Sequence, residues 1–238
     1  MNVIILAGGL GTRLHEKTNK IPKPMVKIGR KPMLLHIIEY FQKFELNKFI
    51  VCSGYKSHYI KDYFVKNHKV LNSNTFKYKG SEVKTINTGI KTNTGERIYK
   101  VKEYLDKNFY ITYGDGLSDV DLNQVRKVNE KYNSALTLSV GHPTSRFGEI
   151  KLKKNKVLEF NEKPLLKEWI NIGYMYGNLN LLNYVKKGDV FEVDSMRRLL
   201  KNSELSAHKH EGNFFPVDNI RDLKQINNLL KKGNAFWV

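Results

Sequence analysis

Residues 1–14, MNVIILAGGLGTRL, are the stretch around which the rest of the chain is organised. Residues 2–6 are nearly all apolar and β-prone, which is typical of a strand buried on both faces of a parallel sheet. Three glycines among residues 8–11 then let the backbone turn sharply and bring its N–H groups against an anion. Arg13 follows with five hydrogen-bond donors and a permanent charge. The stretch therefore predicts a strand that ends in an anion-binding turn.

Lys23 comes ten residues after Arg13, in the sequence IPKP, where two prolines stiffen the backbone around one ammonium group. The glycine turn, Arg13 and Lys23 together describe a pocket for a polyphosphate. The turn is neither G-x-G-x-x-G nor the Gly-Lys-Ser/Thr form of a P-loop, and no acidic residue follows where a dinucleotide site needs one. A glycine-rich turn by itself is a weak signal, and a plain strand-to-helix turn explains it equally well.

Composition places the chain among globular proteins with one domain. It has 238 residues, and 40% of them are hydrophobic, which is enough for a substantial core. No apolar run approaches the roughly 18 residues that a membrane span needs, and Met1 leads directly into the first strand without a signal peptide. Cys52 is the single cysteine, so it excludes an internal disulfide and fits a reducing compartment. We therefore expect a cytoplasmic protein without a membrane partner, in which Cys52 is a buried and inert thiol.

The net charge of +18 raises the hypothesis of a nucleic-acid partner. The lysines, however, are spread over the entire chain, and arginine is scarce beside lysine. A compositional bias on a solvated surface explains this pattern better than a nucleic-acid site. We expect no nucleic-acid partner, although anionic substrates would benefit from the positive field.

Strands and helices alternate through the first 141 residues. Strands are expected at residues 2–6, 49–52, 83–87, 109–113 and 135–140, and helices at residues 33–44, 57–64, 94–105 and 121–132. Residues 66–81 are polar and irregular, and we interpret them as a flexible loop that closes over a ligand or packs on another subunit. The alternation predicts an α/β fold with right-handed βαβ units on a Rossmann-like, mainly parallel sheet flanked by helices.

A small β-rich region is expected after Gly141. Its strands are predicted at residues 149–152, 157–160, 170–176 and 205–210, with helices at residues 192–200 and 220–230.

Two aspartates, Asp115 and Asp218, are candidate functional residues. Asp115 lies between two glycines at the carboxyl end of a predicted strand, where open α/β sheets put their chemistry. Asp218 is isolated in an apolar stretch. Taken alone, Asp115 is interpreted as a strand-end turn residue and Asp218 as a helix N-cap.

The joint pattern resembles the sugar-phosphate nucleotidyltransferases, enzymes that join a nucleoside triphosphate to a sugar 1-phosphate and release pyrophosphate. The matching stretches are LAGGLGTRL at 6–14, PKP at 22–24, CSGYK at 52–56, NTG at 87–89, TGER at 94–97, YGDG at 113–116, RFG at 146–148, EKP at 162–164 and FFPVDNIR at 214–221. The resemblance covers nearly the whole chain. It is nearest to the cytidylyltransferases of glucose 1-phosphate, which the sequence KGNAFW at 232–237 also resembles.

The resemblance implies CTP as donor, a phosphorylated small molecule as acceptor, and Mg²⁺ as cofactor. It implies that Asp115 and Asp218 hold the metal, for which two carboxylates with phosphate oxygens and waters are suitable ligands. Arg13 and Lys23 are the expected catalytic residues. The expected nucleotide-binding residues are Leu6, Ala7, Gly8, Gly9, Gly11, Thr12, Thr88, Gly89 and Gly114. The expected acceptor-binding residues are Arg97, Lys163, Asn171 and Gly173.

The same resemblance implies a single domain over residues 1–238, with a nucleotide-binding half at 1–141 and an acceptor-binding half at 142–238. It also implies a homo-oligomer and a role in the biosynthesis of surface polysaccharides. The sequence departs from the family in two places. The segment between Tyr63 and Val83 looks shorter, and Ile172 puts a branched side chain where a glycine leaves room for the sugar. The acceptor is therefore glucose 1-phosphate or another phosphorylated molecule, including a non-sugar one. A catalytically silent, nucleotide-binding regulatory homologue is a further alternative.

Overall fold

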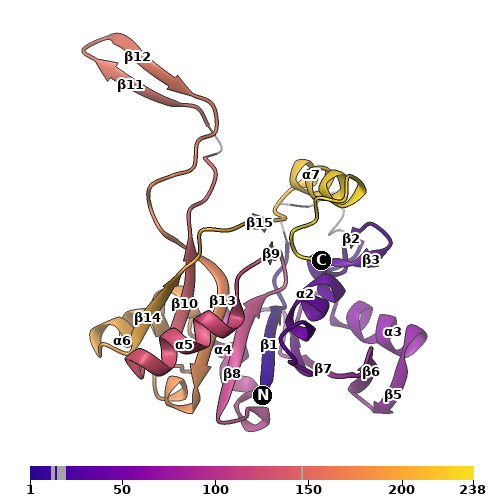
Figure 1. The fold of residues 1–238 in the computed structure, drawn as a ribbon. Coiled ribbons are helices and arrows are strands. Elements are labelled where there is room, and N and C mark those ends of the chain that lie inside the picture. The colour runs from indigo at the N-terminus through magenta and orange to yellow at the C-terminus, as the bar shows by residue number, and fades with distance from the viewer. Residues whose placement is uncertain (12–13, 15–19, 146) are drawn as a thin grey trace.

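A computed structural model describes residues 1–11, 14, 20–145 and 147–238 of the chain. The described residues form a nine-stranded sheet in the order β14-β10-β13-β8-β1-β4-β7-β6-β5 (Figure 1). At its centre, β1 (Asn2–Ala7) pairs in parallel with β4 (Lys48–Ser53) and β8 (Asn108–Tyr113), and β7 (Ser81–Asn87) continues the parallel run beyond β4. Every residue of β1 is buried, as its apolar sequence predicts.

The second half of the chain extends the same sheet beyond β8. There β13 (Ile170–Asn178) runs antiparallel between β8 and β10 (Leu136–Gly141), and β14 (Leu205–Lys209) pairs in parallel with β10. In the described part of the chain, only β13 and β6 run against the other strands of this sheet. The expectation of an α/β fold with a mainly parallel sheet is confirmed.

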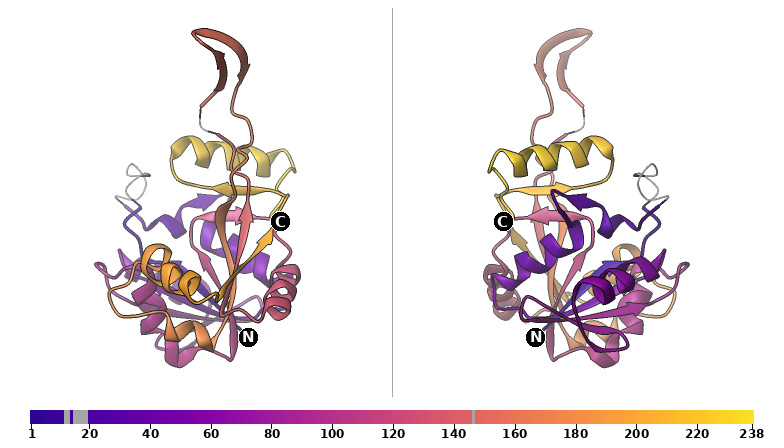
Figure 2. Two further views of the ribbon diagram at one scale, coloured as in Figure 1. Left: turned by 90° about the vertical axis from the view of Figure 1, so that its left-hand side faces the viewer. Right: turned by 90° about the vertical axis from the view of Figure 1, so that its right-hand side faces the viewer.

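Helices cover both faces of the sheet (Figure 2). One layer contains α2 (Met33–Gln42), α3 (Ser57–Asn67), α5 (Leu122–Tyr132) and α7 (Ile220–Lys231), and the other contains α4 (Thr94–Lys100), η4 (Leu179–Asn183), η5 (Phe191–Ser195) and α6 (Met196–Lys201). The alternation of β1 explains the two layers, because Val3 and Ile5 pack into the first hydrophobic cluster and Ile4 and Leu6 into the second.

The prediction of a flexible loop at residues 66–81 is wrong. After α3, the strands β5 (Lys69–Asn72) and β6 (Thr75–Tyr78) form an antiparallel hairpin that continues the sheet beyond β7. Phe76 on β6 is fully buried and its ring stacks on that of Phe64, with ring centroids 5.4 Å apart. The hairpin was not predicted because its strands are only four residues long and alternate two buried aromatic residues of β6, Phe76 and Tyr78, with polar ones.

The strands β11 (Glu149–Lys153) and β12 (Lys156–Asn161) form a hairpin arm that projects far from the body of the molecule (Figures 1 and 2). Cross-strand pairs give the arm one apolar face, where Ile150 lies opposite Phe160 and Leu152 opposite Val157. These four side chains are all exposed. The other face carries an ion pair between Lys151 and Glu159 at 2.7 Å. The two predicted strands are therefore confirmed, but packing against the body does not stabilise them.

Several short elements complete the fold. They are η2 (Lys23–Met25), β2 (Lys27–Ile28), β3 (Lys31–Pro32), η3 (Lys102–Tyr104), β9 (Gly116–Ser118) and β15 (Phe214–Pro216). Near the carboxyl end, Trp237 is buried and its indole Nε1 donates a hydrogen bond to His36 Nδ1 at 3.1 Å. Cys52 is fully buried, and burial raises the pKa of its thiol to about 12, so the prediction of an inert thiol agrees with its surroundings.

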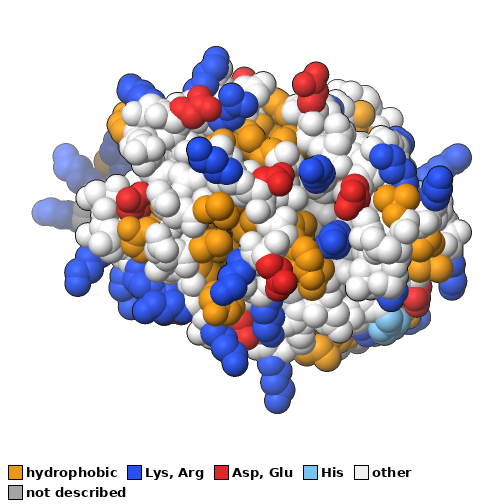
Figure 3. Space-filling view, turned by 90° about the horizontal axis from the view of Figure 1, so that it is seen from below, with side chains coloured by type: hydrophobic (Ala, Val, Ile, Leu, Met, Phe, Trp, Pro, Cys, Tyr) orange, Lys and Arg blue, Asp and Glu red, His pale blue; other side chains and the backbone are white. Residues whose placement is uncertain are grey.

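Charged side chains are dispersed over the face of the molecule at the amino end of β1. In the view along the sheet from the amino end of β1, lysine and arginine side chains are scattered among acidic and hydrophobic ones (Figure 3). None of the helices in the described ranges combines the length and the apolar character that crossing a membrane requires.

Candidate active site

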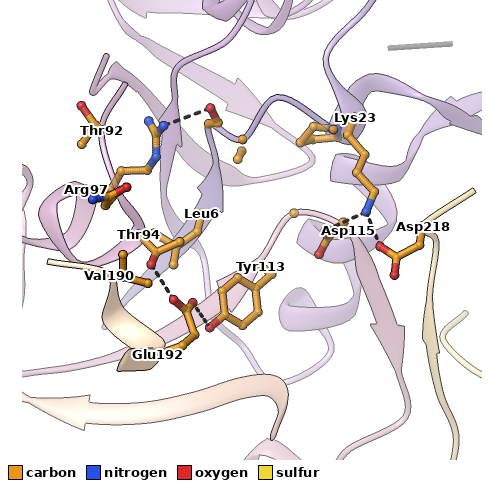
Figure 4. A pocket seen from close by; sticks show the side chains of 17 residues that line it. Leu6, Lys23, Thr92, Thr94, Arg97, Tyr113, Asp115, Val190, Glu192 and Asp218 are labelled. Atoms are coloured by element: carbon orange, nitrogen blue, oxygen red, sulfur yellow. Dashed lines mark hydrogen bonds and ion pairs between the residues drawn. The ribbon is translucent and has the colours of Figure 1, made fainter. Parts of the chain in front are cut away.

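A cavity of about 430 Å³ opens at the carboxyl ends of β1 and β8 (Figure 4). It is lined by Leu6, Ala7, Gly8, Gly9, Gly11, Lys23, Pro24, Thr92, Asn93, Thr94, Arg97, Tyr113, Gly114, Asp115, Val190, Glu192 and Asp218. Many of these are residues that the sequence singled out: the glycine turn, Lys23, Arg97, Gly114 and the two aspartates. The cavity lies where open α/β sheets bind their ligands.

Lys23 lies between the two predicted metal ligands. Its Nζ contacts Asp115 Oδ2 at 2.8 Å and Asp218 Oδ1 at 2.9 Å. The lysine side chain is only 10% exposed. Burial opposes its charged form, but the attraction of Asp115 and the hydrogen bonds to both carboxylates outweigh burial and raise the pKa of Lys23 above its ordinary value. The ammonium is therefore charged throughout the physiological range.

The pairing of β9 with β15 brings the two aspartates together although they are far apart in the sequence. Gly116, directly after Asp115, lies opposite Pro216, and Val217 N donates a hydrogen bond to Asp115 O at 2.9 Å. Asp218 is not the N-cap of the last helix. Asn219 caps α7, in a reciprocal capping box with the side chain of Asp222. The carboxylate of Asp218 is thus not engaged in capping and reaches Lys23.

The two carboxylates fit a divalent cation. Asp115 and Asp218 direct one oxygen each toward a single cationic nitrogen, which shows that a positive charge is accommodated between them. Carboxylate oxygens are the donors that Mg²⁺ prefers, and magnesium usually takes its remaining ligands from substrate phosphates and water. Among the described residues, no group of three or more His, Cys, Asp or Glu side chains is able to hold a metal ion.

Arg97 supports the glycine turn from behind. The residue is 3% exposed, and its guanidinium donates to Ser53 O at 3.1 Å, to Gly8 O at 3.0 Å and to the hydroxyl of Thr88. All three partners are neutral oxygens, and burial lowers the pKa of Arg97 below its ordinary value. A Cβ on Gly8 would lie 2.1 Å from Nη1 of Arg97, so only glycine permits this close approach. The structure therefore places Arg97 at the glycine turn.

A second polar group lines the cavity away from Lys23, and no motif in the sequence pointed to it. Glu192 on η5 accepts hydrogen bonds from Thr94 Oγ1, at 2.6 Å, and from the hydroxyl of Tyr113. Burial, followed by the charge of Glu192, raises the pKa of Tyr113 well above its ordinary value, so the phenol remains a donor. Tyr113 could have been found from its place in the YGDG motif. Glu192 could not, because nothing in residues 190–195 distinguishes it from a surface acid.

Other predicted residues lie outside the lining of the cavity. Thr88 and Gly89 lie behind the glycine turn, where Thr88 Oγ1 also bonds to Ser53 O at 2.7 Å. Asn171 Oδ1 accepts from the N–H of Gly173 at 2.9 Å. Lys163, two residues after the end of β12, pairs with its neighbour Glu162 at 3.2 Å. Thr12, Arg13 and Arg146 fall outside the described residues.

Ile172 does not intrude on the cavity. It is 3% exposed and belongs to the hydrophobic cluster beneath α2, where it packs close to Gly141. Neighbouring residues of a strand point to opposite faces of the sheet, so Ile172 and Gly173 face different sides of β13. The expectation that the branched side chain takes the room of a sugar stays a prediction, because Lys163, Asn171 and Gly173 do not line this cavity either.

Comparisons with known proteins identify the family of the chain. The family model described as nucleotidyl transferase matches residues 2–233. The glucose-1-phosphate cytidylyltransferase of Salmonella typhimurium is 35% identical over 253 residues, covering 100% of this chain and 98% of that protein. A probable glucose-1-phosphate cytidylyltransferase of Bacillus subtilis is 32% identical over 251 residues, covering 100% and 99%.

Solved structures show the same fold. The crystal structure of HddC from Yersinia pseudotuberculosis is 26% identical, with a TM-score of 0.73 over 96% of this chain and 99% of that one. A second crystal structure of HddC is a complex with GMP-PN. The family match over nearly the whole chain, together with full-length relatives above 30% identity, establishes that this chain belongs to the nucleotidyl transferase family and is a nucleotidyltransferase.

Proposed function

We propose that this enzyme joins CTP to a phosphorylated small molecule and releases pyrophosphate. The observation that carries the proposal is one cavity that presents the glycine turn beside Lys23, Asp115 and Asp218. The names of the Salmonella and Bacillus relatives support CTP as donor and glucose 1-phosphate as acceptor. A related phosphorylated acceptor, including a non-sugar one, remains the alternative, because fold and family do not define the acceptor.

In the proposed reaction, an oxygen of the acceptor phosphate forms a bond to the α-phosphorus of CTP. The bond from that phosphorus to the bridging oxygen breaks, and pyrophosphate leaves with the electron pair. The acceptor phosphate is already ionised at neutral pH, so the step needs no general base. Positioning and charge neutralisation supply the catalysis in transfers of this kind.

The chain's own residues have distinct roles in this proposal. The charged Lys23 contacts the α-phosphate or the attacking phosphate, and the backbone of Gly8 and Gly9 receives the phosphates of the nucleotide. Asp115 and Asp218 would hold Mg²⁺, which when bound neutralises charge that develops on the phosphates. Arg13, which lies outside the described residues, is proposed from the family resemblance to hold the leaving pyrophosphate.

The acceptor is proposed to lie toward the 142–238 half, and the nucleotide within the 1–141 half. Lys163, Asn171 and Gly173 are the proposed acceptor residues in that half, and Arg97 is proposed to join them from the 1–141 half. We further propose a cytoplasmic location and a role in surface-polysaccharide synthesis, both of which rest on the family resemblance.

A homo-oligomer is also proposed. An isolated two-stranded hairpin is marginally stable in water, and the apolar face of the arm is uncovered in the single chain. A second copy of the chain that packs on Ile150 and Phe160 would remove this exposure. Light scattering on the wild type and on an I150S/F160S variant tests the idea. A wild-type monomer would contradict it.

The enzymatic proposal is tested by pyrophosphate release with Mg²⁺, each of the four common nucleoside triphosphates, and a panel of phosphorylated acceptors. Release with CTP and glucose 1-phosphate is the expected result. If pyrophosphate is released with CTP and a different acceptor, but not with glucose 1-phosphate, the proposed mechanism stands and the acceptor is the other molecule. Asp218→Asn is the matched variant, because it keeps the shape of the side chain and removes its charge. Failure of every pair, while CTP still binds, would favour a regulatory homologue over the enzyme.

A further inference from the structure

The strands β9 and β15 form a two-stranded sheet that is separate from the nine-stranded one (Figure 1). Asp115 directly precedes β9, and Asp218 lies two residues after the end of β15. The ladder between the strands has three residue pairs, and in one of them Pro216 has no N–H to donate. An isolated two-stranded pair is marginally stable in water. The register that brings Asp218 beside Asp115 therefore depends on contacts outside this ladder.

Asp119 and Asn213 supply such contacts at the other end of the ladder. Asn213 donates its backbone N–H to Asp119 Oδ1 and its side-chain amide to Asp119 Oδ2, both at 2.7 Å. Asp119 N donates in return to Asn213 O at 3.3 Å. Hydrogen bonds to a charged carboxylate are stronger than those between neutral groups. We call these three bonds the Asp119 clasp.

Two residues before Asn213 are adapted to the Asp119 clasp. His210 Nε2 lies 2.9 Å from Asp119 Oδ1 and 3.3 Å from Asn213 O. Both oxygens are acceptors, so this nitrogen carries a proton and donates. A Cβ on Gly212 would lie 2.5 Å from Asp119 Oδ1, and a side chain there would push against the carboxylate. The absence of a side chain at position 212 is therefore a requirement of the clasp.

Ser118, His210 and Asp119 are the residue types of a hydrolytic triad, but their geometry is a different one. In a triad, one ring nitrogen faces the serine and the other faces the carboxylate. Here Nε2 faces both, at 3.4 Å from Ser118 Oγ and 2.9 Å from Asp119 Oδ1. Ser118 is fully buried, and its hydroxyl donates to Asn213 O at 2.7 Å. The group therefore holds Asn213 in place and does not contain a nucleophile.

The segment that carries Asp119 is itself fixed to the body of the protein. The hydroxyl of Tyr174 donates to Gly116 O at 3.2 Å, and that of Tyr40 donates to Val120 O at 2.6 Å. Both tyrosines are buried. Asp119 lies between these two attachment points, so its carboxylate holds Asn213 from a fixed position. The clasp thereby connects β15, and the aspartate that follows it, to the body.

We infer that Asp119 is a positioning residue, which holds Asn213 and thereby sets the separation of the Asp115 and Asp218 carboxylates that receive a divalent cation. The inference rests on the proposed function, which assigns the cation to these two aspartates. Asp119 does not line the cavity and acts through β15.

Four variants separate the clasp from other roles of Asp119. Asp119→Ala removes both acceptor oxygens. Gly212→Ala keeps every partner and displaces the carboxylate with a Cβ. Asp119→Asn should retain the clasp, because its Oδ1 still accepts and the amide of Asn213 can turn over to accept from the new Nδ2. Asp121→Ala is the matched control, because Asp121 is a nearby carboxylate that also accepts backbone N–H groups but caps α5.

Two measurements are made on each variant. Hydrogen exchange of the metal-free protein reports on Val217 N–H, which donates to Asp115 O at 2.9 Å at the junction of the two aspartates. Titration with Mn²⁺ in the presence of CTP, followed by the EPR signal of the free ion and corrected for the ion that CTP binds alone, gives the cation affinity without turnover.

Asp119→Ala and Gly212→Ala should exchange Val217 N–H at least about tenfold faster than the wild type and bind Mn²⁺ about tenfold more weakly. Asp119→Asn and Asp121→Ala should match the wild type in both measurements. Asp121→Ala should nevertheless have a lower Tm, because it loses a helix cap. A merely structural role of Asp119 would make Asp119→Ala resemble this control.

Wild-type exchange or wild-type Mn²⁺ affinity in Asp119→Ala would overturn the inference. Equal weakening of Mn²⁺ binding in Asp119→Asn and Asp119→Ala would also overturn it, because the charge of Asp119 and not the clasp would then act on the cation. If Asp119→Ala does not fold, the same two results in Gly212→Ala decide.

The inference and the proposed function can fail separately. Weaker Mn²⁺ binding in Asp119→Ala, without pyrophosphate release by the wild type from any pair of substrates, would leave the role of Asp119 standing and refute the enzymatic assignment. Pyrophosphate release by the wild type, with unchanged Mn²⁺ binding in Asp119→Ala, would refute the role of Asp119 alone. A wild type that binds no Mn²⁺ with CTP would refute the metal assignment of the proposed function, and the inference with it.

Discussion

Gly173 permits the ring of Tyr113 to lie at the floor of the cavity, and its replacement by alanine should be costly for two separate reasons. The residue has a φ of +82°, in the left-handed region that L side chains rarely adopt. A Cβ built there would lie 2.4 Å from Cδ2 of Tyr113. The ring cannot withdraw freely, because it is half-buried and its hydroxyl is bonded to Glu192.

The left-handed conformation costs alanine about 1 kcal/mol or slightly more. Pushing an aromatic ring out of a packed site typically costs a further 1–3 kcal/mol or so. Gly173→Ala should therefore lower the free energy of unfolding by about 3 kcal/mol. For a chain of this length, that corresponds to a decrease in Tm of roughly 10 °C.

The chain contains a matched control in Gly188. Its φ is +86°, but no atom lies within 4 Å of an added Cβ. Gly188→Ala should lose about 1 kcal/mol, the conformational cost alone. Urea unfolding of both variants, followed by fluorescence, gives the two values. Equal losses of unfolding free energy in the two variants would refute the reasoning, because they would show that the ring of Tyr113 moves away from the added Cβ at no cost.

Three further outcomes are expected. Lys23→Met should reduce kcat/KM for pyrophosphate release by at least about a hundredfold, whereas the control Lys127→Met on α5 should leave kcat/KM unchanged. Near-normal turnover of Lys23→Met would show that Lys23 has no part in the mechanism. Burial opposes ionisation of Glu39, but hydrogen bonds from two lysines and a tyrosine outweigh burial and lower the pKa of Glu39 to about 2. The free energy of unfolding should therefore decrease as pH falls from 4.5 toward 2. In acid unfolding, Glu39→Gln should show a smaller decrease than the wild type. Burial lowers the pKa of His36 below 6.5, so its neutral ring stabilises the fold at higher pH and this contribution is lost as pH falls below that value. Trp237→Phe leaves His36 Nδ1 without its donor and should cost about 1–2 kcal/mol in thermal unfolding at pH 7.5; an unchanged Tm would contradict this.

The order of strands and helices was predictable because its signals are local. The apolar run of β1, the amphipathic stripe of α2 and the strand β8 ending just before Asp115 each carry their own periodicity, and the structure has all three. The β5–β6 hairpin was missed because four-residue strands give almost no periodic signal. Its contacts with the rest of the fold, such as the ring stacking of Phe76 on Phe64 and the hydrogen bond from Tyr78 to Glu39, are tertiary.

The residues of the site also divide into those that sequence motifs predict and those that only tertiary packing brings to the cavity. Lys23, Asp115 and Asp218 stand in motifs and are found together as the resemblance implies, although their roles remain predictions. The burial of Ile172 could not be predicted, because a motif does not tell which face of a strand a side chain occupies. Glu192 was missed because it enters the cavity through tertiary packing of η5 on α4, and no neighbouring residue in the sequence records that contact.

The contacts of Lys23 with Asp115 and Asp218 also have a consequence for how activity arises during folding. Lys23 is separated in sequence by 92 residues from Asp115 and by 195 from Asp218. Contacts of such long range close large loops, and the entropy cost of loop closure slows their formation. An intermediate that has built β1 and its turn, but has not yet docked β15 on β9, has a place for phosphates and lacks the second carboxylate. Recovery of turnover after dilution from denaturant should therefore lag behind recovery of helical signal, which makes catalysis itself a reporter of the last docking step.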